Sequence, residues 1–130
     1  DAETAGRLER LQRDLFAVGA MLADPRQKIA RRVDKALLTD EDIARLEGWI
    51  DACDRELRPL TRFILAGGSK AGGMLHVART VCRRAERQIV ALGDAEVDPV
   101  VVVFVNRLSD LLFTLARLVN ARAGIPETEW

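Results

Sequence analysis

Residues 75–87 read LHVARTVCRRAER, and their charged and apolar residues separate onto two faces if the chain is helical here. At about 100° per residue, the apolar residues between Leu75 and Ile89 fill one sector of the helix. The adjacent sector, roughly 100° wide, is polar and holds His76, Arg79, Arg83, Glu86 and Arg87. This segregation predicts an amphipathic helix that buries one face and leaves an arginine-rich face outside.

Three arginines share that polar face with a single carboxylate. Arg79, Arg83 and Arg87 follow one another at intervals of four residues, and like charges at this spacing repel in a helix. The arrangement costs stability unless an anion is present, and guanidinium groups favour phosphate and carboxylate. The pattern predicts a polyphosphate site, although a salt-bridged surface or a subunit interface fits the spacing about equally well.

Apolar residues recur at helical spacing in three other segments, and no segment is convincing as a strand. Helices are expected at about 4–23, from Thr39 to about Pro59, at about 72–92 and at about 99–123. Residues 25–38 are basic and irregular, which predicts an exposed loop. The first two helices carry the following stripe residues: Leu8, Leu11, Leu15, Val18 and Leu22, then Ile43, Leu46, Ile50, Cys53 and Leu57.

Four long helices joined by short connections predict an all-α fold, an up-and-down helical bundle in a single domain over residues 1–130. The fourth helix follows Pro99, which suits a first helical turn, and its leucines keep a helical period. One face of this helix becomes significant if it meets the arginine-rich helix. That face holds Asn106, Asp110, Phe113, Arg117 and Asn120.

Acidic and basic residues balance at 20 each, so no global charge favours a nucleic acid or an anionic membrane. No apolar run approaches the roughly 20 residues needed to cross a bilayer. The chain begins at Asp1 with neither an initiator methionine nor a signal-peptide pattern. We therefore expect a cytoplasmic protein whose natural N-terminus lies upstream. Cys53 and Cys82 fall in apolar sectors without metal-ligand spacing, which predicts buried free thiols.

The glycine-rich stretch 67–73 has the glycine spacing of a nucleotide-binding P-loop, but Gly73-Met74 stands where Lys-Ser/Thr is required. The alternatives are a flexible connection between helices, or a helix N-terminus whose free N–H groups bind an anion. His76 is the only histidine, and the sequence has no paired Glu-x-x-His motifs of a di-iron bundle. We expect no metal site built from protein ligands and no Ser-His-Asp triad.

Three segments carry a family resemblance: FILAGGS at 63–69, LHVARTVCRRAER at 75–87 and FVNRLSDLLFTLAR at 104–117. In order and spacing they resemble the PduO-type ATP:cob(I)alamin (corrinoid) adenosyltransferase family. The resemblance extends weakly through LQRDLFAVGAMLA at 11–23, so it covers nearly the whole chain.

The resemblance implies a bundle of five helices that assembles as a homotrimer, with active sites between subunits. It implies transfer of the 5′-deoxyadenosyl group of ATP to the cobalt of a reduced corrinoid, cob(I)alamin or a relative, giving adenosylcobalamin and triphosphate. Mg²⁺ is expected with the nucleotide, and a reductase or a corrinoid-dependent enzyme as a further partner. Because Co(I) is itself a powerful nucleophile, the protein's expected tasks are positioning and charge stabilisation, with no catalytic nucleophile.

The matching motifs also imply binding residues. Arg83 and Arg87 are similar to the arginines that bind the ATP phosphates, and Glu86 to the glutamate that orients them and approaches the nucleotide or its Mg²⁺. Asn106 resembles the asparagine that reaches the nucleotide from the last helix. Phe63 matches an aromatic residue under the corrin ring, where it excludes the lower axial ligand and makes Co(II) easier to reduce.

Three further residues are expected to support this site. Arg79 matches an arginine that pairs with an aspartate of a neighbouring subunit. Arg84 points away from the main sector, so a structural salt bridge is expected for it. Asp110, within the NRLSD motif, is expected to hold neighbouring arginines in place.

The chain also departs from the family pattern. Ala66 replaces the usual proline of FILPGGS, and Leu111 stands where an aromatic residue is common. The N-terminal ATP loop and the first helix, with its interface aspartate, have no counterpart in residues 1–130, so four helices are expected instead of five. A non-catalytic bundle that binds nucleotide or corrinoid, as a sensor or carrier, and a structural oligomerisation bundle are the alternatives.

Overall fold

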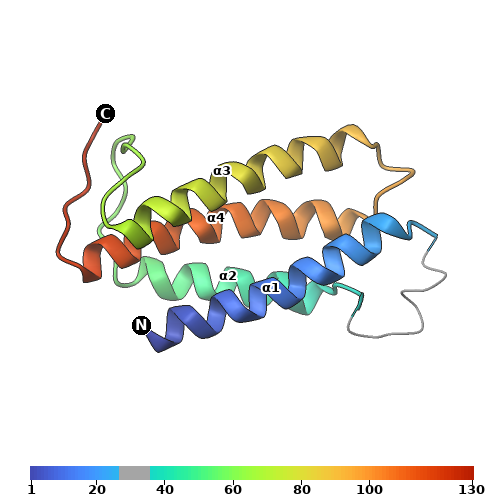
Figure 1. Cartoon of the computed structure of the whole chain (residues 1–130), viewed down its shortest axis with the longest axis horizontal. Coiled ribbons are helices and arrows are strands. Elements are labelled where there is room, and N and C mark those ends of the chain that lie inside the picture. The colour runs from blue at the N-terminus through green and yellow to red at the C-terminus, as the bar shows by residue number, and fades with distance from the viewer. Residues whose placement is uncertain (27–35) are drawn as a thin grey trace.

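The computed structural model describes residues 1–26 and 36–130, and these residues form four α-helices (Figure 1). The helices are α1 (Ala2–Ala23), α2 (Asp40–Asp54), α3 (Lys70–Ala91) and α4 (Pro99–Arg122). The predicted all-α class and all four predicted helices are confirmed. Most of the basic loop predicted at 25–38 lies outside the described residues.

The α4 helix is the core of the bundle. It packs most extensively against α3, then against α2, and more lightly against α1. Thirteen of its 24 residues are buried, and Phe104, Leu111 and Leu115 are fully enclosed. By length and composition α4 is apolar enough to cross a membrane, although it contains no apolar run of that length. More than half of that segment is covered by the other helices, as in the core helix of a bundle.

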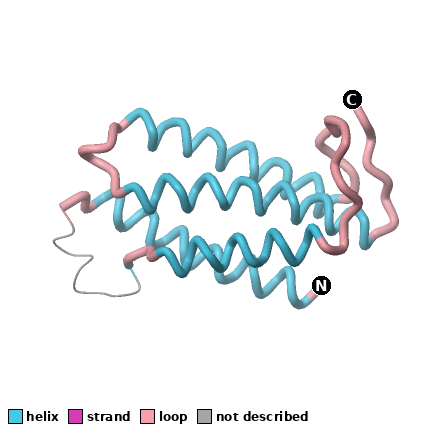
Figure 2. The backbone as a smooth tube through the Cα atoms, turned by 180° about the vertical axis from the view of Figure 1, so that it is seen from behind, coloured by secondary structure: helices cyan, strands magenta, loops and turns pink. Residues whose placement is uncertain are grey.

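Both chain termini and the connection between α2 and α3 lie at one end of the bundle (Figures 1 and 2). The last residues, 125–130, run beside this connection, and Ile64 pairs with Glu129 in an isolated antiparallel bridge. The FILAGGS motif at 63–69 is therefore held next to residues more than 60 positions further along the chain.

Local backbone chemistry explains two helix boundaries that differ from the prediction. The Ser69 hydroxyl accepts a hydrogen bond from the Gly72 amide at 2.9 Å, and this N-cap starts α3 at Lys70, two residues early. The α2 helix ends at Asp54, well before Pro59. The Glu56 amide donates to the Cys53 carbonyl at 3.0 Å and the Leu57 amide to the Asp54 carbonyl at 3.2 Å, so the chain leaves the helix in a tight turn before it reaches Pro59.

One predicted apolar position on α1 is wrong. Leu15 is 46% exposed, and the neighbouring Asp14 is buried instead. The Asp14 carboxylate accepts hydrogen bonds from Arg45 of α2 at 2.7 Å and from Arg10 at 3.1 Å. A buried charge is tolerated only with such partners, so this pairing allows Asp14 to lie on the inward face of α1 with Leu11 and Val18, which are buried as predicted.

Cys53 and Cys82 are free and buried, as predicted. The Cys82 Sγ atom lies 3.5 Å from the Val105 carbonyl oxygen, between α3 and α4. Burial raises the pKa of the Cys82 thiol to about 11, and burial also raises the pKa of Cys53. Since the thiolate is the reactive form, both cysteines are expected to be inert in the folded protein.

The native protein should therefore be alkylated slowly. A rise of about two pKa units makes the Cys82 thiolate about 100-fold scarcer near neutral pH. We expect at least that reduction in the rate of iodoacetamide labelling at pH 8, relative to the protein unfolded in guanidinium, measured by mass spectrometry of the Cys82 peptide. Labelling of the native protein at the unfolded rate would contradict the observed burial.

Candidate functional site

Glu86 joins the arginine-rich face of α3 to the polar face of α4. Its Oε1 atom accepts a hydrogen bond from Asn106 Nδ2 at 2.8 Å, and its Oε2 atom accepts one from Arg83 Nη1 at 3.0 Å. Asn106 in turn accepts a hydrogen bond from Arg107 at 2.6 Å. The two faces thus meet, and three of the four residues expected to bind ATP are in direct contact.

The arginines of this face are accessible while their carboxylate is enclosed. The Arg83 side chain is 46% exposed, whereas that of Glu86 is 14% exposed. Arg84 and Arg87 are exposed and form no ion pair within residues 1–26 and 36–130. The surface consequently carries an excess of positive charge, which suits an oxyanion. The expected ATP contact of Arg87 and the salt bridge expected for Arg84 stay predictions.

Arg79 lies on the same helix but packs on an aromatic ring of α4. Its guanidinium carbon is 5.0 Å from the Phe113 ring centroid, and that of Arg117 is 6.0 Å from the same centroid. These cation–π contacts fix Phe113 between two arginines. The ion pair expected between Arg79 and a neighbouring subunit stays a prediction.

His76 is buried and packs edge-on against Phe113, with 6.1 Å between the ring centroids. Burial lowers the pKa of His76, and the positive charge of Arg79 lowers it further. The imidazole is therefore a neutral packing element at neutral pH.

Asp110 pairs with Arg107, one turn earlier on α4, at 3.1 Å. It holds an arginine as expected, but that arginine belongs to α4 and not to the arginine-rich helix. Arg107 also donates to Asn106, so Asp110 is linked through Arg107 to the cluster of Asn106, Glu86 and Arg83.

Phe63 does not lie on the arginine-rich face of α3 but in the connection between α2 and α3, at one end of the bundle. Its side chain is 80% exposed, and Leu60, Leu65 and Trp130 are exposed nearby in the same connection or in the segment bonded to it. The backbone at this point is fixed, because the Trp130 amide donates to the Phe63 carbonyl at 2.9 Å. An ordered apolar surface of this kind suits a flat apolar ligand or another protein chain.

The Asn120 side chain of α4 received no role from the sequence pattern, yet it organises the glycine-rich stretch. It is buried, it donates to the Gly67 carbonyl at 2.8 Å, and it accepts from the Ser69 amide at 2.9 Å and the Ser69 hydroxyl at 2.8 Å. A Cβ atom at Gly68 or Gly72 would lie 2.3 or 2.2 Å from this amide. The glycines therefore admit Asn120, and this explains their spacing without a P-loop.

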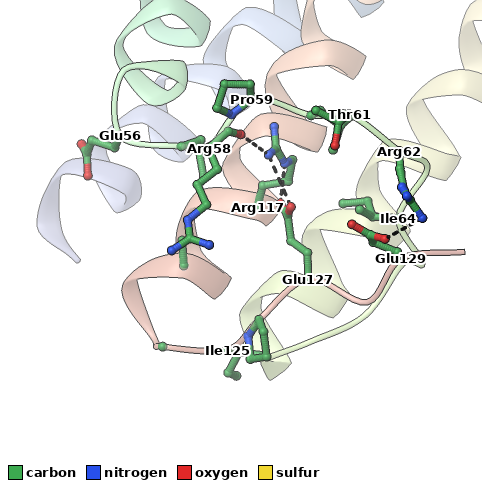
Figure 3. Close-up of a pocket in the computed structure, with 15 residues that line it drawn as sticks. Glu56, Arg58, Pro59, Thr61, Arg62, Ile64, Arg117, Ile125, Glu127 and Glu129 are labelled. Carbon is green, nitrogen blue, oxygen red and sulfur yellow. Dashed lines mark hydrogen bonds and ion pairs between the residues drawn. The ribbon is translucent and has the colours of Figure 1, made fainter.

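A pocket of about 560 Å³ opens between the α2–α3 connection, the end of α4 and the last residues of the chain (Figure 3). Arg117 forms one wall, where it donates to Glu127 at 2.5 Å and to the Arg58 carbonyl at 2.8 Å. Arg62 and Glu129 form a second ion pair at 3.5 Å. Arg117 was placed correctly on the polar face of its helix, but its partners lie in irregular segments that the sequence pattern did not pair.

The chain belongs to the cobalamin adenosyltransferase family, whose model matches residues 1–119. The corrinoid adenosyltransferase MMAB of Bos taurus is 49% identical over 123 residues, and the corrinoid adenosyltransferase of Bacillus subtilis is 43% identical over 129 residues. These matches cover 92% and 98% of this chain but 51% and 64% of the relatives. The chain thus spans between half and two thirds of their length.

Solved structures agree with this assignment. A variant PduO-type ATP:corrinoid adenosyltransferase from Lactobacillus reuteri, complexed with cobalamin and ATP, has a TM-score of 0.85 at 36% identity, and the match covers 96% of this chain and 68% of that one. A second variant, complexed with ATP, has a TM-score of 0.84 at 36% identity, covering 95% and 68%. The family resemblance predicted from the motifs is confirmed.

The pKa of His76 yields a prediction for stability. Because the folded-state pKa lies below the ordinary value of 6.5, the unfolded chain binds a proton first as pH falls, so stability is full above about pH 6.5 and declines below it. When the pH is lowered from about 7.5 to about 5.5, the melting temperature of His76→Gln should fall by less than that of the unchanged protein. If the melting temperatures of the two proteins, measured by circular dichroism, fall by the same amount, this role of His76 is contradicted.

Proposed function

We propose that this chain is the helical part of an ATP:corrinoid adenosyltransferase, which transfers the 5′-deoxyadenosyl group of ATP to a reduced corrinoid. The observation that carries the proposal is the position of Glu86. It binds Arg83 and Asn106 together and leaves the rest of the Arg83 guanidinium exposed. Family membership and the neighbours complexed with cobalamin and ATP support the same conclusion.

In the proposed reaction, the electron pair of Co(I) forms a bond to C5′ of ATP. The C5′–O bond breaks, its electron pair leaves on the triphosphate, and the cobalt becomes Co(III). Negative charge therefore grows on the triphosphate, and the proposed task of Arg83 and Arg87 is to stabilise it. Glu86 is held by Asn106 and binds one side of the Arg83 guanidinium, which lowers the cost of orienting Arg83 for a bidentate contact.

Mg²⁺ fits this proposal as a companion of the phosphates. Among the residues that the structure describes, no group of three or more His, Cys, Asp or Glu side chains is placed to hold a metal ion. Glu86 is already bonded to Arg83 and Asn106, so phosphate oxygens and water would supply most of the ligands, since Mg²⁺ gives up its water reluctantly.

The corrinoid is proposed to bind at the exposed apolar end of the bundle, over Phe63. A rigid aromatic side chain on the lower face of the corrin would exclude water or the lower axial ligand from cobalt. Co(II) without that ligand accepts an electron more readily, because no axial electron pair raises the energy of the acceptor orbital. Phe63 is 80% exposed on a fixed backbone, which suits this task.

We also propose a homotrimer with its active sites between subunits, in the cytoplasm, that works with a reductase or a corrinoid-dependent enzyme. Apolar residues are exposed along a face of α3 that is separate from its arginine-rich face: Met74 at 66%, Val77 at 65% and Val81 at 49%. Their spacing of three and four residues makes a continuous stripe. A contact between copies of the chain would cover this stripe.

Arg83→Ala should weaken the use of ATP by roughly 10- to 150-fold, because a charge-assisted hydrogen bond contributes roughly 1.5–3 kcal/mol. The measurement is the rate of alkyl-cobalt formation from Co(I) corrinoid, with the full-length protein and varied ATP. Arg13→Ala is the matched control, since Arg13 is an exposed arginine of α1 that pairs only with Glu9 among the described residues. Near-normal turnover of Arg83→Ala would contradict the assignment of Arg83 to ATP binding.

Phe63→Ala should lose more activity when the substrate starts as Co(II) with a reductant than when it is supplied as Co(I). The side chain acts before adenosyl transfer, at the reduction step, so a substrate already reduced bypasses it. Leu65→Ala, an exposed apolar neighbour in the same connection, is the control for general loss of apolar surface. Equal losses from Co(I) and Co(II) would argue against the axial-ligand role of Phe63.

A further inference from the structure

The connection that carries Phe63 has no regular secondary structure, yet its backbone is held by hydrogen bonds at two places, Gly67–Ser69 and Phe63–Leu65. At the glycine end, the buried Asn120 amide uses both of its polar atoms on Gly67 and Ser69. Gly68 has a φ of +103°, which a residue with a side chain adopts rarely. The backbone therefore takes this path only because glycine permits it and Asn120 holds it.

The second place, Phe63–Leu65, is held by the last residues of the chain. The Leu65 amide donates to the Thr128 carbonyl at 2.8 Å, and the Trp130 amide donates to the Phe63 carbonyl at 2.9 Å. These two bonds lie on either side of Ile64, so the backbone next to Phe63 is paired as in a short strand.

The last residues are themselves anchored to α4. Arg117 is 6% exposed, and its guanidinium binds the Glu127 carboxylate and the Arg58 carbonyl, so it joins both segments that border the pocket (Figure 3). Arg117 and Asn120 are three residues apart, on one face of the most buried helix. Both ties of the Phe63 connection thus originate from a single rigid turn of α4.

We propose that Arg117 and Asn120 are positioning residues that fix Phe63 beneath the corrin ring. This inference rests on the proposed function. A side chain that excludes a ligand must resist displacement, and an aromatic residue on a mobile loop would swing away and readmit water. Neither residue touches the substrate; Asn120 acts through the Gly67–Ser69 backbone, and Arg117 acts through Glu127 and the residues that follow it.

Asn120→Ala is the direct test, and Asn106→Ala on the same helix is its matched control. We expect Asn120→Ala to lose roughly 5- to 50-fold in activity from Co(II), corresponding to the loss of about one or two hydrogen bonds. Its loss from Co(I) should be several-fold smaller, and its KM for ATP unchanged. Asn106→Ala should raise the KM for ATP and affect both cobalt states equally. Equal losses from Co(I) and Co(II) in Asn120→Ala would overturn the proposal.

A second variant disrupts the Asn120 contact by changing Gly72, the residue against which the Asn120 amide packs. A Cβ at Gly72 would lie 2.2 Å from the Asn120 Oδ1 atom, so Gly72→Ala must displace this amide. Because alanine favours a helix, this variant should still fold. We expect Gly72→Ala to reproduce the Co(II)-selective loss, and to add nothing further in an Asn120→Ala background. Additive losses would show that the two residues act separately, and would overturn the mechanism.

Hydrogen exchange separates this inference from the proposed function. In Asn120→Ala the Ser69 amide should exchange faster, because it loses its acceptor on α4. In Arg117→Lys the Leu65 amide should exchange faster, because the last residues that pair with it lose their anchor on α4. Unchanged exchange at both amides overturns the positioning role even if the enzyme is active. If the unchanged protein forms no alkyl-cobalt product, the proposed function fails, and the inference about Phe63 fails with it.

Discussion

The packing of α3 on α4 is the contact on which both ends of the site depend. Helix α4 is buried along most of its length, so it serves as a fixed reference for the helix that lies against it. Side-chain contacts cross this interface from one end to the other. They link Ser69 to Asn120, Arg79 to Phe113, Cys82 to Val105 and Glu86 to Asn106.

This interface also resolves the electrostatic conflict in the arginine-rich helix. Repulsion between like charges one turn apart costs only about 0.2–0.5 kcal/mol per pair. A hydrogen bond to a charged group contributes about 1.5–3 kcal/mol when enclosed, and less at a half-exposed group such as Arg83. Glu86 can therefore outweigh the repulsion locally, while its second oxygen is fixed by Asn106. The arginines that remain exposed keep their charge available for an anion.

The same interface connects the two proposed substrate sites. Ser69 caps the N-terminus of α3, and its amide and hydroxyl are bound by Asn120. The connection that bears Phe63 ends at this cap, and the helix that bears Arg83 begins there. The apolar surface and the arginine face are thus parts of one rigid unit, which is what a transfer between two bound substrates requires.

The helices and the amphipathic character of the arginine-rich helix were predictable from the sequence, because apolar periodicity and arginine spacing are local signals. Glu86, Arg83 and Asn106 meet as the motifs implied. The burial of Asp14, next to the exposed Leu15, was not predictable, since it depends on an ion pair with Arg45 on another helix. The role of Asn120 was also missed, because its bonds reach backbone groups more than 50 residues away. Backbone partners leave no side-chain pattern in the sequence.

The most direct test of the central claim is the anaerobic absorbance spectrum of cob(I)alamin mixed with the full-length protein and ATP. The account predicts conversion to the alkyl-cobalt spectrum that depends on both protein and ATP, with one triphosphate released per corrinoid converted. Binding of ATP and corrinoid without that conversion would identify a carrier or sensor and would contradict the account.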